Sequence, residues 1–324
     1  KYSMSWVSEL KRQIYRWAVP IATRSKTWLE QDVPQIEQAR PVPTDVQAPV
    51  KLIDNLADLD AELSEVEKGF AISDDEGRRR LLKSQYALRD DYPDDPYSPD
   101  YAAAQMQMYL ALSGRSSYSP EINEHSPFDL EQAVSTPFPY LTRSPTTVGE
   151  QLMAQGFLIR AMDLHPGARI VEFGPGPGNV TLHLAQMGYR VTAVEIERNF
   201  SELIHRRAEA LGVEIDLVNQ DMVTFEPSEQ YDAALFFDSF HHCADHLQML
   251  RSLSETIASD GRVVFATEPI GDFPHPWGFV RTDGLTLWSI RKYGWFEMGF
   301  DVSYFFRTLL KFGWLPRYHA SDVA

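Results

Sequence analysis

The sequence contains almost no cysteine, no long apolar run and fewer basic than acidic residues, and each shortage limits what the protein can be. Cys243 is the single cysteine among 324 residues, which excludes an internal disulfide and fits a reducing compartment. No apolar run reaches the ~20 residues that span a bilayer. No signal peptide is visible, so we expect a cytoplasmic protein, at most at the inner face of the membrane through its N-terminal segment. Because the chain begins at Lys1 rather than Met, we also expect it to be a piece of a longer protein.

The shortage of basic residues argues against a nucleic-acid partner. The chain has 46 acidic residues against 30 Lys and Arg, a formal net charge of −16. A surface of that sign repels phosphate backbones, whereas nucleic-acid binders usually carry a basic footprint. A sugar, or a neutral or cationic acceptor, is the partner that this charge favours.

A glycine-rich stretch, IVEFGPGPGNVT at residues 170–181, organises the rest of the chain. A β-branched run ends in Glu172, glycines follow at 174, 176 and 178, and a helix is expected from about Val180. A strand that turns into a helix through glycines leaves backbone N–H groups unpaired and lets a ligand approach the main chain. The stretch therefore predicts the nucleotide-binding corner of a doubly wound α/β sheet.

The following hundred residues support this prediction. Strands are expected over 191–195, 213–218, 231–237 and 261–267, with helices over 198–211 and 246–258 between them. This alternation predicts a parallel sheet. Glu195 closes the second strand 23 residues after Glu172, close to the ~20 expected for a ribose-binding acid.

On these residues, the region 145–324 resembles the class I S-adenosylmethionine (SAM)-dependent methyltransferases. The resemblance is carried by the E-x-G-x-G-x-G pattern that starts at Glu172, by Glu195 and by Asp221 after the third strand. The stretches FFDSFHHCADH (236–246) and EPIGDFPHPWGF (268–279) are similar to bacterial glycan-modifying methyltransferases, which are often fused to glycosyltransferases. The resemblance implies a Rossmann-like, mostly parallel sheet and SAM as cofactor.

Matching the family's motif residue by residue implies a cofactor site. Glu172 would orient the glycine turn or contact the methionine amino group, Glu195 would accept both ribose hydroxyls, and Asp221 would bind the adenine amino group. Tyr140 and Thr142 belong to the N-terminal segment that the family places over the SAM pocket. The implied cofactor-binding residues are Glu172, Gly174, Pro175, Gly176, Gly178, Glu195, Ile196, Asp221, Met222, Asp238, Tyr140 and Thr142.

Two histidines at the end of the fourth strand are the first candidates for catalysis. An alcohol acceptor is a poor nucleophile at neutral pH, and histidine is the usual general base. His241 and His242 are both retained, with a slight preference for His242, although one of them can be purely structural. Glu268 ends the fifth strand and is the third candidate, as the base or as the group that orients a histidine.

A metal is the rival use of these groups. Asp238, His242 and His246 are each four residues apart, a spacing that would place them on one helix face and suit zinc or manganese. Asp245 more simply caps the next helix, because an acid at a helix N-terminus is favourable. We therefore predict no catalytic metal.

The remaining regions are assigned more coarsely. Residues 1–50 are predicted as an N-terminal helix and a proline-rich linker, because Leu10, Ile14 and Trp17 have helical spacing. Attachment to a membrane surface through neighbouring basic residues is the alternative. Residues 51–144 are predicted as a helical cap or lid, and 145–324 as the methyltransferase domain. The family's usual terminal antiparallel strand is not visible before Ala324.

The aromatic segment after the fifth strand has two interpretations. Its rings can fill a core, or they can stack against the apolar faces of a sugar in an acceptor cleft. On the second interpretation His275, Trp277 and Arg281 are the candidate acceptor-binding residues.

The sequence thus predicts an O-methyltransferase that uses SAM, with a histidine base and a hydroxyl acceptor on a bacterial surface glycan or its precursor. A glycosyltransferase domain or partner is the associated expectation. A methyltransferase for a natural product or quinone, and a non-catalytic SAM-binding scaffold of a glycosyltransferase assembly, are the alternatives.

Overall fold

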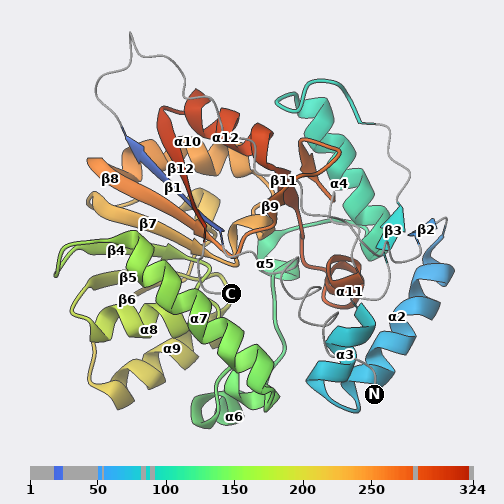
Figure 1. Cartoon of the computed structure of the whole chain (residues 1–324), viewed down its shortest axis with the longest axis horizontal. Coiled ribbons are helices and arrows are strands. Elements are labelled where there is room, and N and C mark those ends of the chain that lie inside the picture. The colour runs from blue at the N-terminus through green and yellow to red at the C-terminus, as the bar shows by residue number, and fades with distance from the viewer. Residues whose placement is uncertain are drawn as a thin grey trace, which may run out of the picture.

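A seven-stranded sheet forms the centre of the protein in the computed structural model, which describes residues 18–24, 50–52, 55–81, 85–87, 92–279 and 284–320 (Figure 1). The strand order is β12-β1-β8-β7-β4-β5-β6, and β4 to β8 run parallel. This confirms the predicted doubly wound, mostly parallel architecture. The strands are β1 (Ala18–Arg24), β4 (Arg169–Phe173), β5 (Arg190–Val194), β6 (Asp216–Val218), β7 (Tyr231–Phe237), β8 (Ile257–Ala266) and β12 (Trp314–Ala320).

Both faces of the sheet are buried under helices. Because neighbouring residues of a strand point to opposite sides, each strand contributes to two separate cores. Ile170, Leu235 and Val264 belong to one core cluster, together with residues of α7 (Pro145–Met162) and α8 (Asn179–Gln186). The residues that follow each of these three, at positions 171, 236 and 265, belong to the second cluster, with α10 (His246–Thr256) and α12 (Val302–Lys311). The near-continuous apolar character of these strands therefore reflects a sheet between two layers of helices. The helix α9 (Arg198–Leu211) connects β5 to β6.

The strand β1 corrects the prediction for the N-terminal region. Residues 18–24 do not belong to a helix or linker: they form an antiparallel strand between β8 and β12, with Ile21 opposite both Val264 and Arg317. Ile21 and Ala22 are buried in the two cores. The strand takes the place of the terminal antiparallel strand that the sequence lacks. Its seven residues carry too short a pattern to be recognised without their partner strands. The predicted helical stretch of Leu10–Trp17 lies outside the described residues.

A second group of elements lies beside the carboxyl end of the sheet, on the right of Figure 1. The residues at both ends of its helix α4 set the limits of the helix: the Ser98 hydroxyl accepts from the Tyr101 N–H, and Gly114 ends the helix with φ +68°. The helix α11 packs on α4 and α3 and was not predicted. The elements are α2 (Leu56–Phe70), α3 (Asp74–Leu81), α4 (Pro99–Ser113), α5 (Pro120–Asn123), α11 (Gly284–Lys292), β2 (Val50–Leu52), β3 (Gln85–Ala87), β9 (Ile270–Gly271), β10 (Trp277–Gly278) and β11 (Gly299–Asp301). The short helix α6 (Leu130–Ser135) instead packs on α9.

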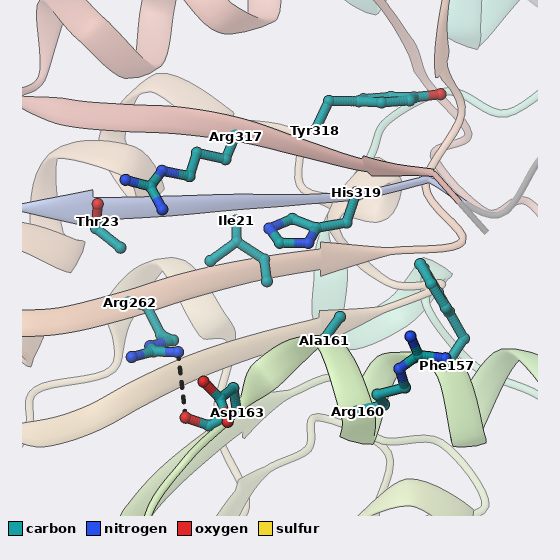
Figure 2. Close-up of a pocket in the computed structure, with 10 residues that line it drawn as sticks. All are labelled: Ile21, Thr23, Phe157, Arg160, Ala161, Asp163, Arg262, Arg317, Tyr318 and His319. Carbon is teal, nitrogen blue, oxygen red and sulfur yellow. Dashed lines mark hydrogen bonds between the residues drawn. The ribbon is translucent and has the colours of Figure 1, made fainter. Parts of the chain in front are cut away.

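Two further features bear on function. A cavity of about 660 Å³ lies where α7 faces β1, β8 and β12 (Figure 2). Across the described ranges, every helix is too short or too polar to cross a membrane.

Candidate functional site

The glycine turn adopts the conformation that its sequence predicts. Gly174, Gly176 and Gly178 all have positive φ, between +53° and +72°. A side chain at Gly174 would lie 2.9 Å from Ser239 Cβ, and one at Gly178 would lie 2.4 Å from Ile204 Cγ1, so these two positions have no room for a Cβ atom. A Cβ atom at Gly176 would instead meet nothing within 4 Å. The turn thus packs tightly at both ends and leaves its middle open to a ligand.

A cavity of about 110 Å³ adjoins this turn, at the carboxyl ends of β4 and β7. It is lined by Glu172, Gly174, Pro175, Gly176 and Asp238 from the predicted cofactor set, and by Phe138, Gln151, Gln155, Pro177, Asn179, Val180 and Phe237. The predicted glycine turn and two of the predicted acids therefore meet at one place. Asp238 has φ +56°, a backbone conformation that is uncommon for a residue with a side chain and that occurs often at binding sites.

The two strand-end glutamates are both buried and both hold the turn in place. Glu195 accepts from the backbone N–H of Gly176 at 2.9 Å and from that of Glu197 at 2.8 Å. Glu172 accepts from the Thr181 hydroxyl at 2.6 Å. Burial raises the pKa of each carboxyl group to about 7. Such groups can exchange these partners for the hydroxyl or amino hydrogens of a ligand.

The other predicted cofactor residues lie outside that cavity. Tyr140 is 44% exposed, and the Thr142 hydroxyl donates to the Pro139 carbonyl. From their segment it is Phe138 that reaches the cavity, and its carbonyl accepts from Asn179 Nδ2. Ile196, Asp221 and Met222 are half-buried. Asp221 accepts from the Val223 N–H, and Met222 Cε lies 3.6 Å from where a Cβ of Gly174 would stand, so this pair borders the turn.

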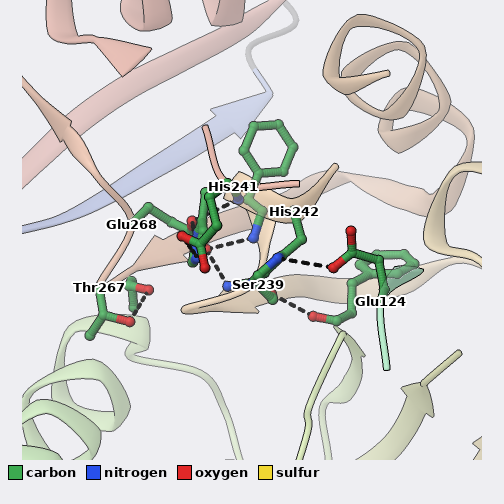
Figure 3. A network of polar contacts seen from close by, with 10 residues as sticks. Glu124, Ser239, His241, His242, Thr267 and Glu268 are labelled. Carbon is green, nitrogen blue, oxygen red and sulfur yellow. Dashed lines mark hydrogen bonds and ion pairs between the residues drawn. The ribbon is translucent and has the colours of Figure 1, made fainter. Parts of the chain in front are cut away.

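Glu268 is a structural anchor rather than a free base (Figure 3). Its carboxylate is fully buried and accepts from the backbone N–H groups of residues 239, 240 and 241 at 2.7–3.0 Å. It also contacts His241 Nδ1 at 2.8 Å. Although burial opposes ionisation, His241 and these hydrogen bonds lower the pKa of Glu268 below its usual value. With its lone pairs occupied, Glu268 can orient His241 but is poorly placed to take a proton. The prediction that Glu268 is itself the base is therefore not supported by this geometry.

His242 is held by a carboxylate that comes from the N-terminal region. Glu124, at the end of α5, places Oε2 3.1 Å from His242 Nδ1 (Figure 3). The other Glu124 oxygen accepts from the Tyr118 hydroxyl and the Phe296 N–H. Burial lowers the pKa of His242, but the ion pair with Glu124 and the charges of Glu297 and Asp238 raise it to about 9. The His242 side chain is 23% exposed, against 7% for His241, and is the more accessible of the two.

Asp238, His242 and His246, the metal-binding group that the sequence offered as the alternative, do not come together. His246 points away from the other two residues into the aromatic core, where its Nε2 meets the Tyr304 hydroxyl at 2.8 Å and its ring packs edge-on against Trp277. Burial lowers its pKa to about 3, so it stays neutral. A different group, His241, His242 and Glu297, does bring three ligand atoms within 4.8 Å of one another, and these residues could reach a common ion.

The predicted acceptor residues fare differently. Trp277 is 2% exposed, and its indole N–H donates to the Pro96 carbonyl, so it is a core residue and not an acceptor contact. His275 packs edge-on against Tyr92, and Arg281 lies outside the described residues. Trp295 is the aromatic residue that approaches the histidines: its ring packs edge-on against His242 at 5.7 Å and stacks on Tyr293 at 4.4 Å.

Several site residues were missed at the sequence level. Glu124, Glu297, Phe138 and Asn179 carried no motif, and Glu124 lies in an irregular stretch 118 residues before His242. An isolated acid in a long loop was the only available signal for Glu124.

Known proteins resemble parts of this chain. The sequence model of a methyltransferase domain family matches residues 150–306. The S-adenosyl-L-methionine-dependent Diels-Alderase iccD of Talaromyces variabilis is 32% identical over 132 residues, which cover 39% of this chain and 43% of that protein. (S)-Coclaurine N-methyltransferase of Thalictrum flavum subsp. glaucum is 30% identical over 129 residues, 38% of this chain and 35% of that protein.

One solved structure also matches part of this chain. The crystal structure of coclaurine N-methyltransferase bound to N-methylheliamine and SAH matches with a TM-score of 0.39 and 21% identity, and covers 64% of this chain and 57% of that one. Both curated relatives named above are matched over less than half of their length.

Proposed function

We propose that this chain, whose residues 150–306 match a methyltransferase domain family, is a class I SAM-dependent methyltransferase that transfers the methyl group of SAM to a hydroxyl group of a sugar acceptor. The observation that carries the proposal is the His242–Glu124 pair, which lies just past the carboxyl end of β7. Hydroxyl acceptors need such a pair because they must lose a proton as the new bond forms.

The residues of the turn fit the cofactor. The middle of the turn is open at Gly176, and Glu172 and Glu195 present buried carboxylates to the amino group and the ribose hydroxyls of SAM. When bound, SAM supplies an activated methyl group on a sulfonium centre. The task left to the protein is to orient the acceptor and to manage one proton.

His242 is the proposed base, and Glu124 orients it. Because Nδ1 of His242 faces Glu124, the opposite ring nitrogen, Nε2, is the one that can accept the acceptor's proton. Glu124 is itself held by two donors, so its carboxylate stays at ion-pair distance from His242 Nδ1, a nitrogen that makes no hydrogen bond to the described residues. Glu268 does the same for His241, whose ring lies 4.3 Å from that of His242. We assign His241 a supporting role.

The aromatic surface next to His242 supports a sugar as acceptor. Tyr293 and Trp295 form a stacked pair, and the Trp295 indole N–H donates to the His125 carbonyl, which fixes its plane. Flat rings next to polar groups suit the apolar faces of sugars. The net charge of −16 disfavours a nucleic-acid acceptor. The acceptor that we propose is a bacterial surface glycan or its precursor. The partner that we propose is a glycosyltransferase that builds this glycan.

Labelled SAM and a panel of acceptors test the proposal. We expect label to enter a polysaccharide or sugar precursor, with a 14-dalton gain in the product by mass spectrometry. Label in a small aromatic or quinone acceptor instead would favour the natural-product alternative. SAM binding without transfer to any member of either panel would favour a non-catalytic scaffold.

A further inference from the structure

The cavity over β1, β8 and β12 concentrates positive charge in an acidic protein. Its volume is about 660 Å³, within the ~300–1,000 Å³ typical of small-molecule pockets. Arg160, Arg262, Arg317 and His319 line it, whereas Asp163 is its single acidic lining residue. Over the whole chain, acids outnumber Lys and Arg by 46 to 30. The charge at this cavity is therefore opposite to that of the chain as a whole.

Three arginines from three different elements line this cavity, with Arg262 and Arg317 at one end and Arg160 at the other, beside Phe157 (Figure 2). Arg160 lies on α7, Arg262 on β8 and Arg317 on β12. Arg317 and His319 are two positions apart on β12, so both side chains point to the same face of the sheet. These arginines are 55 to 157 residues apart in the chain, so the basic lining does not come from a local run of basic residues.

The arginines keep unused donors. Arg262 Nη1 donates to the Met162 carbonyl at the end of α7, but its Nε is buried and has no hydrogen-bond partner among the described residues. No hydrogen bond or ion pair joins Arg160 or Arg317 to any other described residue. A buried donor without a partner costs about 1–3 kcal/mol, so a ligand that supplies acceptor atoms would be stabilised here.

The positive field extends to the neighbouring histidine. Burial, followed by the charges of Arg317 and Arg262, lowers the pKa of His319. Apolar side chains also line the cavity: Ile21 lies between Arg317 and His319, and Phe157 lies beside Arg160 (Figure 2).

We propose that this cavity is a binding site for an organic phosphate monoester, with the phosphate on Arg262 and Arg317, the apolar part of the ligand on Ile21 and Phe157, and Arg160 at the far end of the cavity. Two guanidinium groups at one end suit a group with about two negative charges, which a phosphate monoester carries at neutral pH and a single carboxylate does not. Guanidinium groups also match the geometry of phosphate oxygens through paired hydrogen bonds. The site is separate from the cavity at the glycine turn, with which it shares no lining residue.

Calorimetric titration of the full chain with phenyl phosphate tests this proposal, with inorganic phosphate and phenol as comparisons. We expect one site per chain, tighter binding of phenyl phosphate than of inorganic phosphate, and no binding of phenol. Arg317→Gln should weaken phenyl phosphate binding by about ten-fold, because it removes a charge-assisted hydrogen-bond donor, and Arg160→Gln should weaken it by less, because Arg160 lies farther from the phosphate. Arg317→Lys should keep part of the affinity, because it keeps the charge but not the paired donors.

The matched control is Arg307→Gln on α12, which makes the same charge change at an exposed position outside the cavity. It should bind phenyl phosphate as the unmodified chain does. SAM affinity should be unchanged in all of these variants, which separates this proposal from the proposed function. Vesicles of phosphatidylcholine with phosphatidic acid distinguish the source of the phosphate. Capture that needs phosphatidic acid and falls in Arg160→Gln and Arg317→Gln would support a lipid headgroup. No binding of either probe, or equal loss in Arg307→Gln, would overturn the proposal.

Discussion

The cofactor half and the acceptor half of the site are built in different ways. In the cofactor half, Glu172, Gly176 and Glu195 lie within 24 residues of one another, at the ends of adjacent strands. In the acceptor half, Glu124 binds His242 and the Phe296 N–H, and the latter contact spans 172 residues. The first half follows from one local motif. The second half exists only because the N-terminal region and the segment between α11 and β11 fold against the edge of the sheet.

The largest expected effect separates the two halves directly. His242→Ala should lower methyl transfer by about 10²–10⁴-fold, because it removes the general base. SAM affinity, measured by calorimetry, should stay within about two-fold of the original, since His242 does not line the cavity at the glycine turn. Full activity of His242→Ala with the true acceptor would show that our assignment of the base is wrong.

The reverse separation should come from the glycine turn. Gly178→Ala places a Cβ atom 2.4 Å from Ile204 Cγ1 at a residue with φ +72°. The variant should lose about 1–3 kcal/mol of stability and should also bind SAM more weakly. Gly149→Ala on α7 is the control, because a Cβ there meets nothing within 4 Å. It should keep SAM binding and raise stability by about 0.5–1 kcal/mol. Thermal unfolding measures the stability of each variant, and calorimetry measures its SAM affinity. Equal stability and equal SAM affinity of the two variants would contradict the packing argument.

A third test concerns the contact between the N-terminal region and His242. Glu124→Gln removes the charge that raises the pKa of His242 to about 9. The unmodified enzyme should gain activity as the pH rises toward 9, because His242 must lose its proton to act as a base. In Glu124→Gln this rise should occur at lower pH and reach a plateau about ten-fold lower, because the ring is less well oriented.

Two controls accompany that pH profile. Glu124→Asp should recover part of the plateau, and Glu121→Gln, an exposed change in the same helix, should leave the profile as it was. An unchanged profile in Glu124→Gln would mean that Glu124 serves only to hold the fold together.

A smaller effect is expected from the buried acid of the cofactor half. The pKa of Glu172 is about 7 in the folded chain and about 4.5 in the unfolded chain, so the folded state binds protons more tightly. Its contribution to stability is therefore fully present below pH ~4.5 and is lost as the pH rises through 7. Glu172→Gln should then be more stable than the original at pH 8 by about 1–3 kcal/mol, and similar at pH 4.5. Denaturant unfolding at both pH values checks this, with the exposed Glu226→Gln as a control that should change neither.

The smallest effect should come from metal removal. His241, His242 and Glu297 could reach one ion, but Glu268 and Glu124 already occupy the Nδ1 side of the two histidines. We therefore expect a chelator to leave methyl transfer unchanged. Activity that disappears with the chelator and returns with a divalent ion would instead assign these residues to a metal.

Much of the sheet could be predicted because its signals are local. Helix α9 has the predicted limits Arg198 and Leu211, and β7 has the predicted limits Tyr231 and Phe237. The strand β1 could not be predicted, because its position between β8 and β12 depends on pairing with residues more than 230 positions away. Trp277 was misassigned for a related reason: an aromatic side chain looks the same in sequence whether it is buried against His246 or faces a ligand.

The sequence by itself determined the turn, since positive φ at three alternate glycines and an acid at each strand end are properties of short, contiguous segments. Only the tertiary structure decided which histidine is accessible, which carboxylate orients it and which arginines line one cavity. Those outcomes depend on burial and on distances between residues far apart in the chain, and neither quantity is encoded in any local pattern.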